Sequence, residues 1–285
     1  MPYEKKTDCA GGFVCFAVSG RIYIIFLVPF LWSVVYSLTG GVGGLEFVGL
    51  KHYQSLLQSR AFLLAAKNTL RFLAVSVPLA MLLGLGISLV LYETFQGRSF
   101  LRAVFLFPLT VPIAALIAAL RFCFAQDGML NRLCALIGVE GKDWLGSGTA
   151  FGVLVLVFLW KNCGYNMLLF LMGLYGISDE FIGAARLEGA HAGQVFWYIR
   201  VPLLRPTFFF TVVVSIMNAF KIFREAYLIG GESPHASIYM LQHFMNNNFQ
   251  NLNYQRLSSA AFFIFLFACL LVGGLYWLKN KRGIV

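Results

Sequence analysis

The sequence contains few charged side chains for its length. Asp, Glu, Lys and Arg make up 12% of the 285 residues, whereas a soluble globular domain carries about 25%. Hydrophobic residues account for 59% of the chain, and the mean hydropathy is +0.77. One water-facing globule cannot bury so much apolar surface, and the composition also excludes intrinsic disorder and a collagen-like repeat. We therefore expect an integral membrane protein with several spanning segments.

Motifs for chemistry are also absent. The six cysteines form no CxxC pair and stand near no His at a zinc-ligand spacing, so neither a metal site nor a disulfide scaffold is predicted. There is no GxxxxGK[ST] loop for ATP. The net charge of +10 comes from cations that stand singly between apolar runs. This pattern favours basic loops beside membrane helices over a nucleic-acid surface. We expect a non-catalytic chain without a bound cofactor or metal.

Six apolar runs are long enough to cross a bilayer, which takes about 20 helical residues. We expect helices over approximately 20–38, 68–92, 100–122, 150–176, 203–228 and 258–278. They use most of the chain, so we expect one all-α transmembrane domain over residues 1–285. Basic residues in the tail and at Arg98 and Arg102 favour a cytoplasmic location for both termini.

The connection over residues 177–202 carries the most specific pattern. Asp179 and Glu180 stand at the start of an expected helix, where carboxylates complement the helix dipole. Gly189 permits a sharp turn with positive φ, and Pro202 can begin the next membrane helix. Two short helices joined at a glycine would form a foot that fits a groove on another protein. The alternative is an amphipathic connector that lies on the lipid headgroups.

The same stretch resembles the EAA motif of permease subunits in binding-protein-dependent ABC importers, which reads E-A-A, then Gly four residues later, then I-x-L-P. Ala184, Ala185, Gly189, Ile199 and Pro202 stand at the matching spacings. Gly183 replaces the usual Glu, Glu188 the usual Asp and Val201 the usual Leu. The resemblance implies an ATPase-coupling loop comprising Gly183, Ala184, Ala185, Arg186, Glu188, Gly189, Ala190, Ile199 and Pro202.

Further segments extend the resemblance over nearly the whole chain. They include residues 47–53, Asn68-Thr69-Leu70, and the stretch with Asn131 and Trp144. Together they are similar to the type I maltose and glycerol-phosphate permeases of bacterial-type plasma membranes. The resemblance implies a six-helix permease that imports a sugar or oligosaccharide. Its implied partners are a second permease, usually a paralogue, two ATPase subunits that bind ATP and Mg, and an extracellular binding protein.

Polar residues at membrane depth are candidates for the substrate path, because they are costly unless they face a cavity or a partner. They are Lys161, Asn162, Tyr165 and Asn166 in the fourth run, and Ser215 and Asn218 in the fifth. The alternative is that these residues join helices or stabilise the permease dimer. Lys161 could instead snorkel to the interface or pair with a carboxylate of the partner subunit.

Two other classes of membrane protein have sequence features that differ from those of an importer. An ion-driven secondary transporter usually carries internal repeats and buried acidic residues, but only Glu225 interrupts the apolar runs. A membrane-embedded enzyme needs a catalytic cluster of Asp, His or Cys, and none is recognisable. The four histidines, His52, His191, His235 and His243, show no ligand spacing and are expected to be solvated or interfacial.

Overall fold

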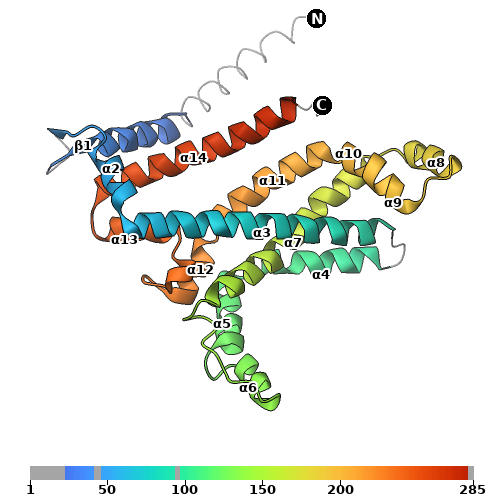
Figure 1. The fold of residues 1–285 in the computed structure, drawn as a ribbon, viewed down its shortest axis with the longest axis horizontal. Helices are drawn as coiled ribbons and strands as arrows, with labels where there is room; N and C mark the ends of the chain where they lie inside the picture. Colours follow the sequence, from blue (N-terminus) through green and yellow to red (C-terminus); the bar gives the residue numbers. More distant parts are fainter. Residues whose placement is uncertain (1–22, 42–45, 94–96, 282–285) are drawn as a thin grey trace, which may run out of the picture. The chain divides into compact units, whose positions relative to one another are not determined.

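The computed structural model describes residues 23–41, 46–93 and 97–281, and almost all of its secondary structure is helical (Figure 1). The two short strands pair antiparallel, with Thr39 opposite Phe47 and Gly40 opposite Glu46. In chain order the elements are the apolar helix Tyr23–Leu38, β1 (Thr39–Gly40), β2 (Glu46–Phe47), α2 (Lys51–Gln58), α3 (Arg60–Glu93), α4 (Arg98–Thr110), α5 (Ile113–Phe124), α6 (Met129–Leu136), α7 (Ala150–Tyr175), α8 (Asp179–Leu187), α9 (Ala192–Gln194), a π-helical turn (Val195–Arg200), α10 (Val201–Leu203), α11 (Arg205–Phe220), α12 (Phe223–Gly230), a 3-10 turn (Ala236–Ile238), α13 (Leu241–Gln250) and α14 (Tyr254–Lys281).

Contacts divide the chain into two compact units. The first unites the residues up to Leu63 with Met245–Cys269, and the second unites Leu64–Phe244 with the residues from Leu270 onward. Both the foot and the candidate path residues belong to the second unit.

The first unit is held by aromatic and hydroxyl contacts between its helices. The rings of Phe30 and Phe265 meet edge to face with their centroids 4.9 Å apart. Tyr53 donates a hydrogen bond to the hydroxyl of Ser37 at 2.6 Å, and Ser259 donates to the Ser37 carbonyl at 3.3 Å. These contacts connect the first apolar helix to α2 and α14.

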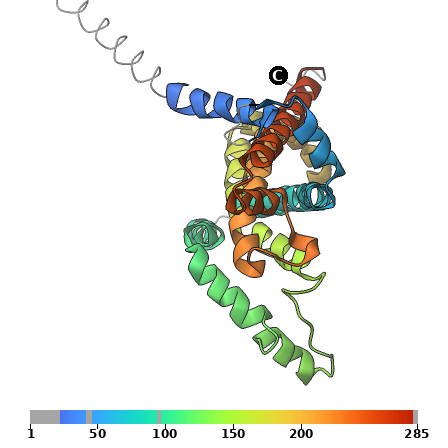
Figure 2. The same ribbon diagram turned by 90° about the vertical axis from the view of Figure 1, so that its left-hand side faces the viewer.

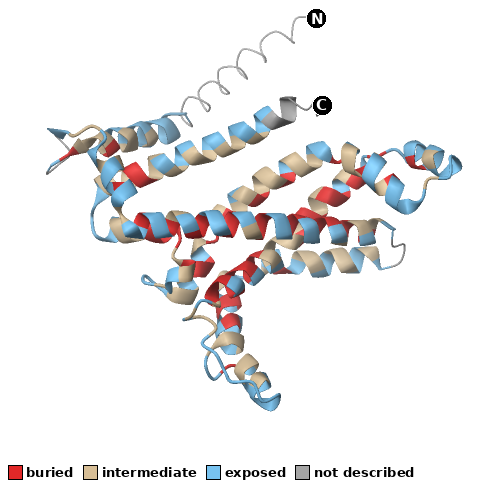
Figure 3. Ribbon diagram, in the orientation of Figure 1, coloured by how far each residue is buried: buried red, intermediate tan, exposed pale blue. Residues whose placement is uncertain are grey.

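The second unit has its core along α3 and α7, where buried residues are concentrated (Figure 3). The ring of Phe72 in α3 lies edge to face against Phe158 of α7, with centroids 5.4 Å apart. Phe170 of α7 packs in the same way on Phe208 of α11, at 4.8 Å. Leu174 and Leu204 are fully buried beside these rings. Large aromatic side chains therefore fill the space between α7 and its neighbours.

Glycines set how closely α7 approaches the helices around it. A Cβ added at Gly164 would collide with the backbone carbonyl of Phe105 in α4. A Cβ at Gly173 would lie 2.5 Å from the hydroxyl of Thr207 in α11. Small residues at such crossings let helix backbones approach closely, which is the usual way in which helices associate within a membrane.

The expected third helix, over 100–122, is wrong as one continuous element. α4 ends at Thr110, and α5 begins at Ile113 after an extended Val111-Pro112 step. Proline lacks the amide proton and disfavours helical geometry in the residue before it, so Pro112 ends α4 at this point. α5 then runs at a steep angle to α4 (Figures 1 and 2).

The expected fifth helix, over 203–228, is also interrupted. α11 ends at Phe220, and the amides of Lys221 and Ile222 bond back to carbonyls three residues earlier. α12 then begins at Phe223. Neither proline nor glycine stands at this break, so the local sequence contains no signal that predicts it.

Five helical stretches in the described residues are long and apolar enough to cross a membrane. They are Arg60–Glu93, Ile113–Leu136, Ala150–Tyr175, Arg205–Gly230 and Tyr254–Trp277. The shorter apolar helix Tyr23–Leu38 matches the first expected run, whose start at residue 20 lies outside the described residues. The fourth run coincides with α7 to within one residue, whereas the second and sixth helices begin earlier than expected and the third span lies later in the chain.

Candidate functional site

The first half of the foot, which is the segment over residues 177–202, forms as expected from its local chemistry. α8 begins at Asp179, and the hydroxyl of Ser178 accepts a hydrogen bond from the Glu180 amide at 3.3 Å. The two carboxylates occupy its first turn, where they favour the helix dipole. Ile182 is buried and anchors α8 to the core of the unit.

A left-handed glycine joins the two halves of the foot. Gly189 has φ +88°, as its place in the pattern predicted. The Ala190 amide donates to the Ala185 carbonyl at 2.9 Å, and the Glu188 amide donates to the Ala184 carbonyl at 3.1 Å. These bonds close the end of α8, and positive φ is readily adopted only by glycine.

The second half of the foot is helical from Ala192 to Leu203 through a π-helical turn. His191 caps it: its ring Nδ1 accepts from the Gln194 amide, and the Gln194 side chain accepts from the His191 amide at 3.0 Å. The expectation that Pro202 begins the membrane helix is wrong. Pro202 lies within α10, and the long helix α11 begins at Arg205.

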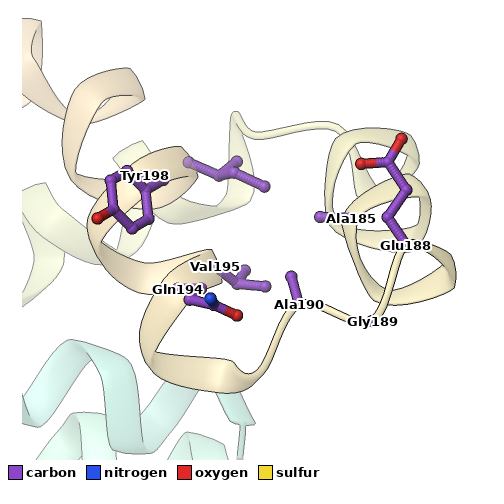
Figure 4. A pocket seen from close by; sticks show the side chains of 8 residues that line it. Ala185, Glu188, Gly189, Ala190, Gln194, Val195 and Tyr198 are labelled. Carbon is purple, nitrogen blue, oxygen red and sulfur yellow. The ribbon is translucent and has the colours of Figure 1, made fainter.

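An open pocket of about 320 Å³ lies between the two halves (Figure 4). Ala185, Glu188, Gly189 and Ala190 line it from the first half, and Gln194, Val195, Tyr198 and Ile199 line it from the second. Gly183 stands in open space, since an added Cβ would meet nothing within 4 Å. Of the motif residues, Gly183, Ala184, Arg186, Glu188 and Gly189 are exposed, and Ala185, Ala190, Ile199 and Pro202 are partly buried.

Large apolar side chains also project from the foot. Leu187 is 92% exposed, Tyr198 79% and Trp197 66%. Exposed apolar groups gathered at one place mark interaction surfaces. The foot therefore exposes apolar surface of the kind that is common at interaction sites.

The polar residues at membrane depth are divided by the structure into separate groups. Asn166 is fully buried in α7, and its Oδ1 accepts a hydrogen bond at 3.1 Å from Ser215, which is fully buried in α11. This contact supports the alternative that the pair joins helices. The Asn162 amide bonds to the Phe158 carbonyl of its own helix. In the described residues the partly buried side chains of Tyr165 and Asn218 make no hydrogen bond.

Lys161 has a partner within its own chain. Its Nζ lies 2.5 Å from Oε1 of Glu225, and the two side chains are 20% and 6% exposed. Glu225 is the third residue of α12, where the helix dipole also favours a carboxylate. The expectation of a partner-subunit carboxylate or a snorkelling Lys161 gives way to this internal pair. The signal in the sequence was the single acidic residue in the apolar runs.

The expectation that all histidines are solvated or interfacial is wrong for His243. This side chain is fully buried in α13, and its Nδ1 accepts a hydrogen bond from the Met240 amide at 3.2 Å. Rings of Phe223 and Tyr239 lie against it, with centroids at 4.9 and 5.8 Å. Burial lowers the pKa of His243 to about 4, because the charged imidazolium loses its hydration there.

Two polar residues outside the foot tie loops to helices. The Asn131 side chain accepts from the Trp144 indole at 2.7 Å and donates to the Lys142 carbonyl at 2.9 Å. The Asn68 amide donates to the carbonyls of Ala236 and Tyr239, at 2.6 and 2.9 Å. Asn68 and Asn131, both of which belong to the family-like segments of the sequence, therefore have a structural role.

Residues 76–282 match the family described as the binding-protein-dependent transport system inner membrane component. The chain belongs to this family. It is a multi-pass membrane permease, a transport subunit rather than an enzyme, and neither an ion-driven transporter nor a membrane-embedded enzyme finds support.

Relatives of known name agree with this assignment. The chain is 34% identical over 191 residues to the trehalose/maltose transport system permease protein MalF of Thermococcus litoralis, covering 66% of this chain and 64% of that one. It is 29% identical over 257 residues to the sn-glycerol-3-phosphate transport system permease protein UgpA of Rhizobium meliloti, covering 86% of each chain.

The fold is that of an ABC importer permease. A chain in the crystal structure of a bacterial alginate ABC transporter, in complex with its alginate pentasaccharide-bound periplasmic protein, matches with a TM-score of 0.85. That match covers 97% of both chains at 17% sequence identity. The expected all-helical permease architecture of type I is thereby confirmed.

Proposed function

We propose that the chain forms one half of the translocation path of an ATP-driven importer for a sugar or oligosaccharide. The observation that carries the proposal is the foot over residues 177–202, in which five of the nine motif residues are exposed, among them the left-handed Gly189. A surface with exposed Leu187, Trp197 and Tyr198 suits a groove on an ATPase subunit. ATP and Mg would bind to that subunit, and this chain would carry the motion.

The substrate proposal rests on the relatives and on charge. Relatives are named for trehalose and maltose, sulfoquinovosyl glycerol and glycerol-3-phosphate. Among the candidate path residues only Lys161 is a cation, and Glu225 already neutralises it. A phosphate or uronate would have to displace that carboxylate from a buried position, which is unfavourable. A neutral saccharide, bound through hydroxyls, fits this chain better.

The proposed assembly has four kinds of component. A second permease, a paralogue of this chain, completes the path, two ATPases dock on the feet, and an extracellular binding protein delivers the sugar. Both termini and the foot face the cytoplasm. The Glu225 and Lys161 pair then lies within the membrane part of α7 and the broken fifth helix.

The test is reconstitution of this chain with a second permease, ATPases and a binding protein encoded beside it. Uptake and ATP hydrolysis are measured in liposomes with a panel of maltose, trehalose and glycerol-3-phosphate. Gly189→Leu should leave the complex assembled but separate hydrolysis from uptake, because leucine at φ +88° distorts the turn of the foot. Ala185→Glu, in the pocket, should act in the same direction.

Gly138→Leu is the matched control. Gly138 also has positive φ, +74°, and open space around it, but it lies outside the foot. Gly138→Leu should introduce similar backbone strain and leave ATP hydrolysis coupled to uptake. The proposal is overturned if both foot variants transport normally, or if the purified chain transports alone.

A further inference from the structure

We propose that Arg200 is the positioning residue that transmits movement of the foot to the ends of the helices α3, α7 and α4. The inference rests on the proposed function, because it names how the foot acts on the rest of the permease. Arg200 occupies the variable position of the I-x-L-P pattern, so the resemblance assigns it no role.

The location of Arg200 is unusual for a cation. It ends the π-helical turn of the foot and is 7% exposed, the one buried Lys or Arg in the described part of the chain. Burying a charge is costly unless the surroundings compensate it. The contacts of its guanidinium therefore show which helices the foot contacts.

Those contacts are with the last two residues of α3. Arg200 Nη1 donates to Oε1 of Glu93 at 2.9 Å, and the guanidinium carbon lies 5.2 Å from the ring centroid of Tyr92. The Glu93 side chain is 64% exposed, so water screens this ion pair. The contact between the buried Arg200 guanidinium and the Tyr92 ring is less exposed to water, and we expect it to contribute more than the ion pair.

Tyr92 continues the connection to α7 and α4. Its ring contacts that of Tyr175, the last residue of α7, with centroids 5.5 Å apart. The Tyr175 hydroxyl accepts hydrogen bonds from Arg98 at 3.0 Å and from Arg102 at 2.7 Å. Both arginines lie at the start of α4. The foot, α3, α7 and α4 thus meet in one continuous set of contacts.

Arg200 also retains an unused donor. Its Nε is buried and has no hydrogen-bond partner among the described residues. A buried donor without a partner is unfavourable, so a second arrangement that satisfies Nε would compete with this one. A guanidinium whose present arrangement leaves one buried donor without a partner suits an element that moves during the transport cycle.

The experiment measures whether the foot and α4 move together. In a cysteine-free form of the complete complex, spin labels are placed at Leu203, beside the foot, and at Phe100 in α4, both of which are exposed. The distance between the labels is measured without nucleotide and with trapped ATP. The wild-type distance should stay the same, because Arg200 carries α4 with the foot.

In Arg200→Gln the distance should shift with ATP, since the foot moves without α4. Stimulation of ATP hydrolysis by the binding protein should also fall about fivefold or more, the usual range of coupling between two sites. Arg200→Lys should retain only part of this stimulation, because an ammonium group lacks the planar face that stacks on the Tyr92 ring. Tyr92→Phe keeps the ring and should behave as wild type, whereas Tyr92→Leu should behave as Arg200→Gln.

Arg205→Gln is the control, because Arg205 is an exposed arginine at the adjacent start of α11. The inference is overturned if Arg200→Gln keeps the wild-type distances and stimulation. It is also overturned if its activity falls only in proportion to complex yield. Failure of the wild-type complex to assemble or respond to ATP would instead contradict the proposed function.

Discussion

The polar cluster of α7 and the foot that follows it differ in where their partners lie. In α7, Asn166 bonds to Ser215 and Lys161 pairs with Glu225, all within this chain. In the foot, Arg186 and Glu188 are exposed and make no ion pair in the described residues. A polar group that is buried with an internal partner stabilises the fold, whereas an exposed polar group contributes little to stability. Matched substitutions in the two regions should therefore have opposite consequences.

Removal of the buried ion pair should have the largest effect on stability. Lys161→Met leaves the Glu225 carboxylate, 6% exposed, without its cation. Breaking a buried pair in this way costs roughly 3–5 kcal/mol. Glu225→Gln should cost less, because Lys161 is 20% exposed and its long side chain can reach water. Thermal melting of the purified complex checks this order.

The foot supplies the controls for that measurement. Arg186→Met and Glu188→Gln remove exposed charges and should change stability by less than about 0.5 kcal/mol. Replacing both members of the α7 pair, as Lys161→Met with Glu225→Leu, should restore most of the lost stability. If Lys161→Met melts like the wild type, the pair is not a structural contact.

Glycine to alanine provides the second comparison. In Gly164→Ala the new methyl group meets the Phe105 carbonyl and must push α4 from α7, at roughly 1–3 kcal/mol for an overpacked site. In Gly183→Ala the methyl group meets nothing within 4 Å, so assembly should be unchanged. Yield and melting temperature of the two variants decide it, and equal losses would contradict the close helix crossing.

Histidine offers a third comparison, through pH. The folded-state pKa of His243 is about 4, below its usual 6.5, so protons bind more tightly to the unfolded chain. Its contribution to stability is therefore complete above pH 6.5 and lost as pH falls toward 4. The linked loss reaches on the order of 1–2 kcal/mol at pH 5.

The exposed His191 of the foot is the reference for this pH effect. His243→Phe, which cannot bind the proton, should flatten the dependence of melting temperature on pH between 7 and 5. His191→Asn, which keeps a capping side chain, should not change it. A wild-type melting temperature that is constant over this range would show that His243 does not titrate as described.

Local signals explain which parts were predictable from sequence. The run over 150–176 predicts α7 to within one residue at its end, because a predominantly apolar run of this length has few alternatives even with a polar cluster inside it. The foot followed from Asp179, Glu180 and Gly189, whose effects act within one helical turn. The break before α5 also has a local signal, which is Pro112. The apolar residues on both sides of this proline nevertheless favour one continuous helix.

Long-range contacts explain the parts that were missed. Glu225 lies 64 residues from Lys161, and Glu93 lies 107 residues from Arg200. A sequence does not say which distant residue will meet a buried cation. The break after Phe220 has no proline or glycine, and α12 contacts α7 through the Lys161 and Glu225 pair and through Ala226, which is buried in the same core.

The smallest expected effect separates the two amides of the candidate path. Asn166→Leu removes the bond to Ser215 and should lower complex stability by about 0.6 kcal/mol, the average for an interhelical hydrogen bond in a membrane. Asn218 is partly buried and makes no side-chain hydrogen bond in the described residues, so Asn218→Leu should leave stability unchanged. If Asn218 instead contacts the passing sugar, its variant should reduce uptake at normal yield. Uptake divided by complex yield therefore distinguishes a contact between helices from a contact with the substrate. We expect the first at Asn166 and, in this pair, the second only at Asn218. A fall in that ratio for Asn166→Leu alone would reverse the assignment and place the path on the α7 side.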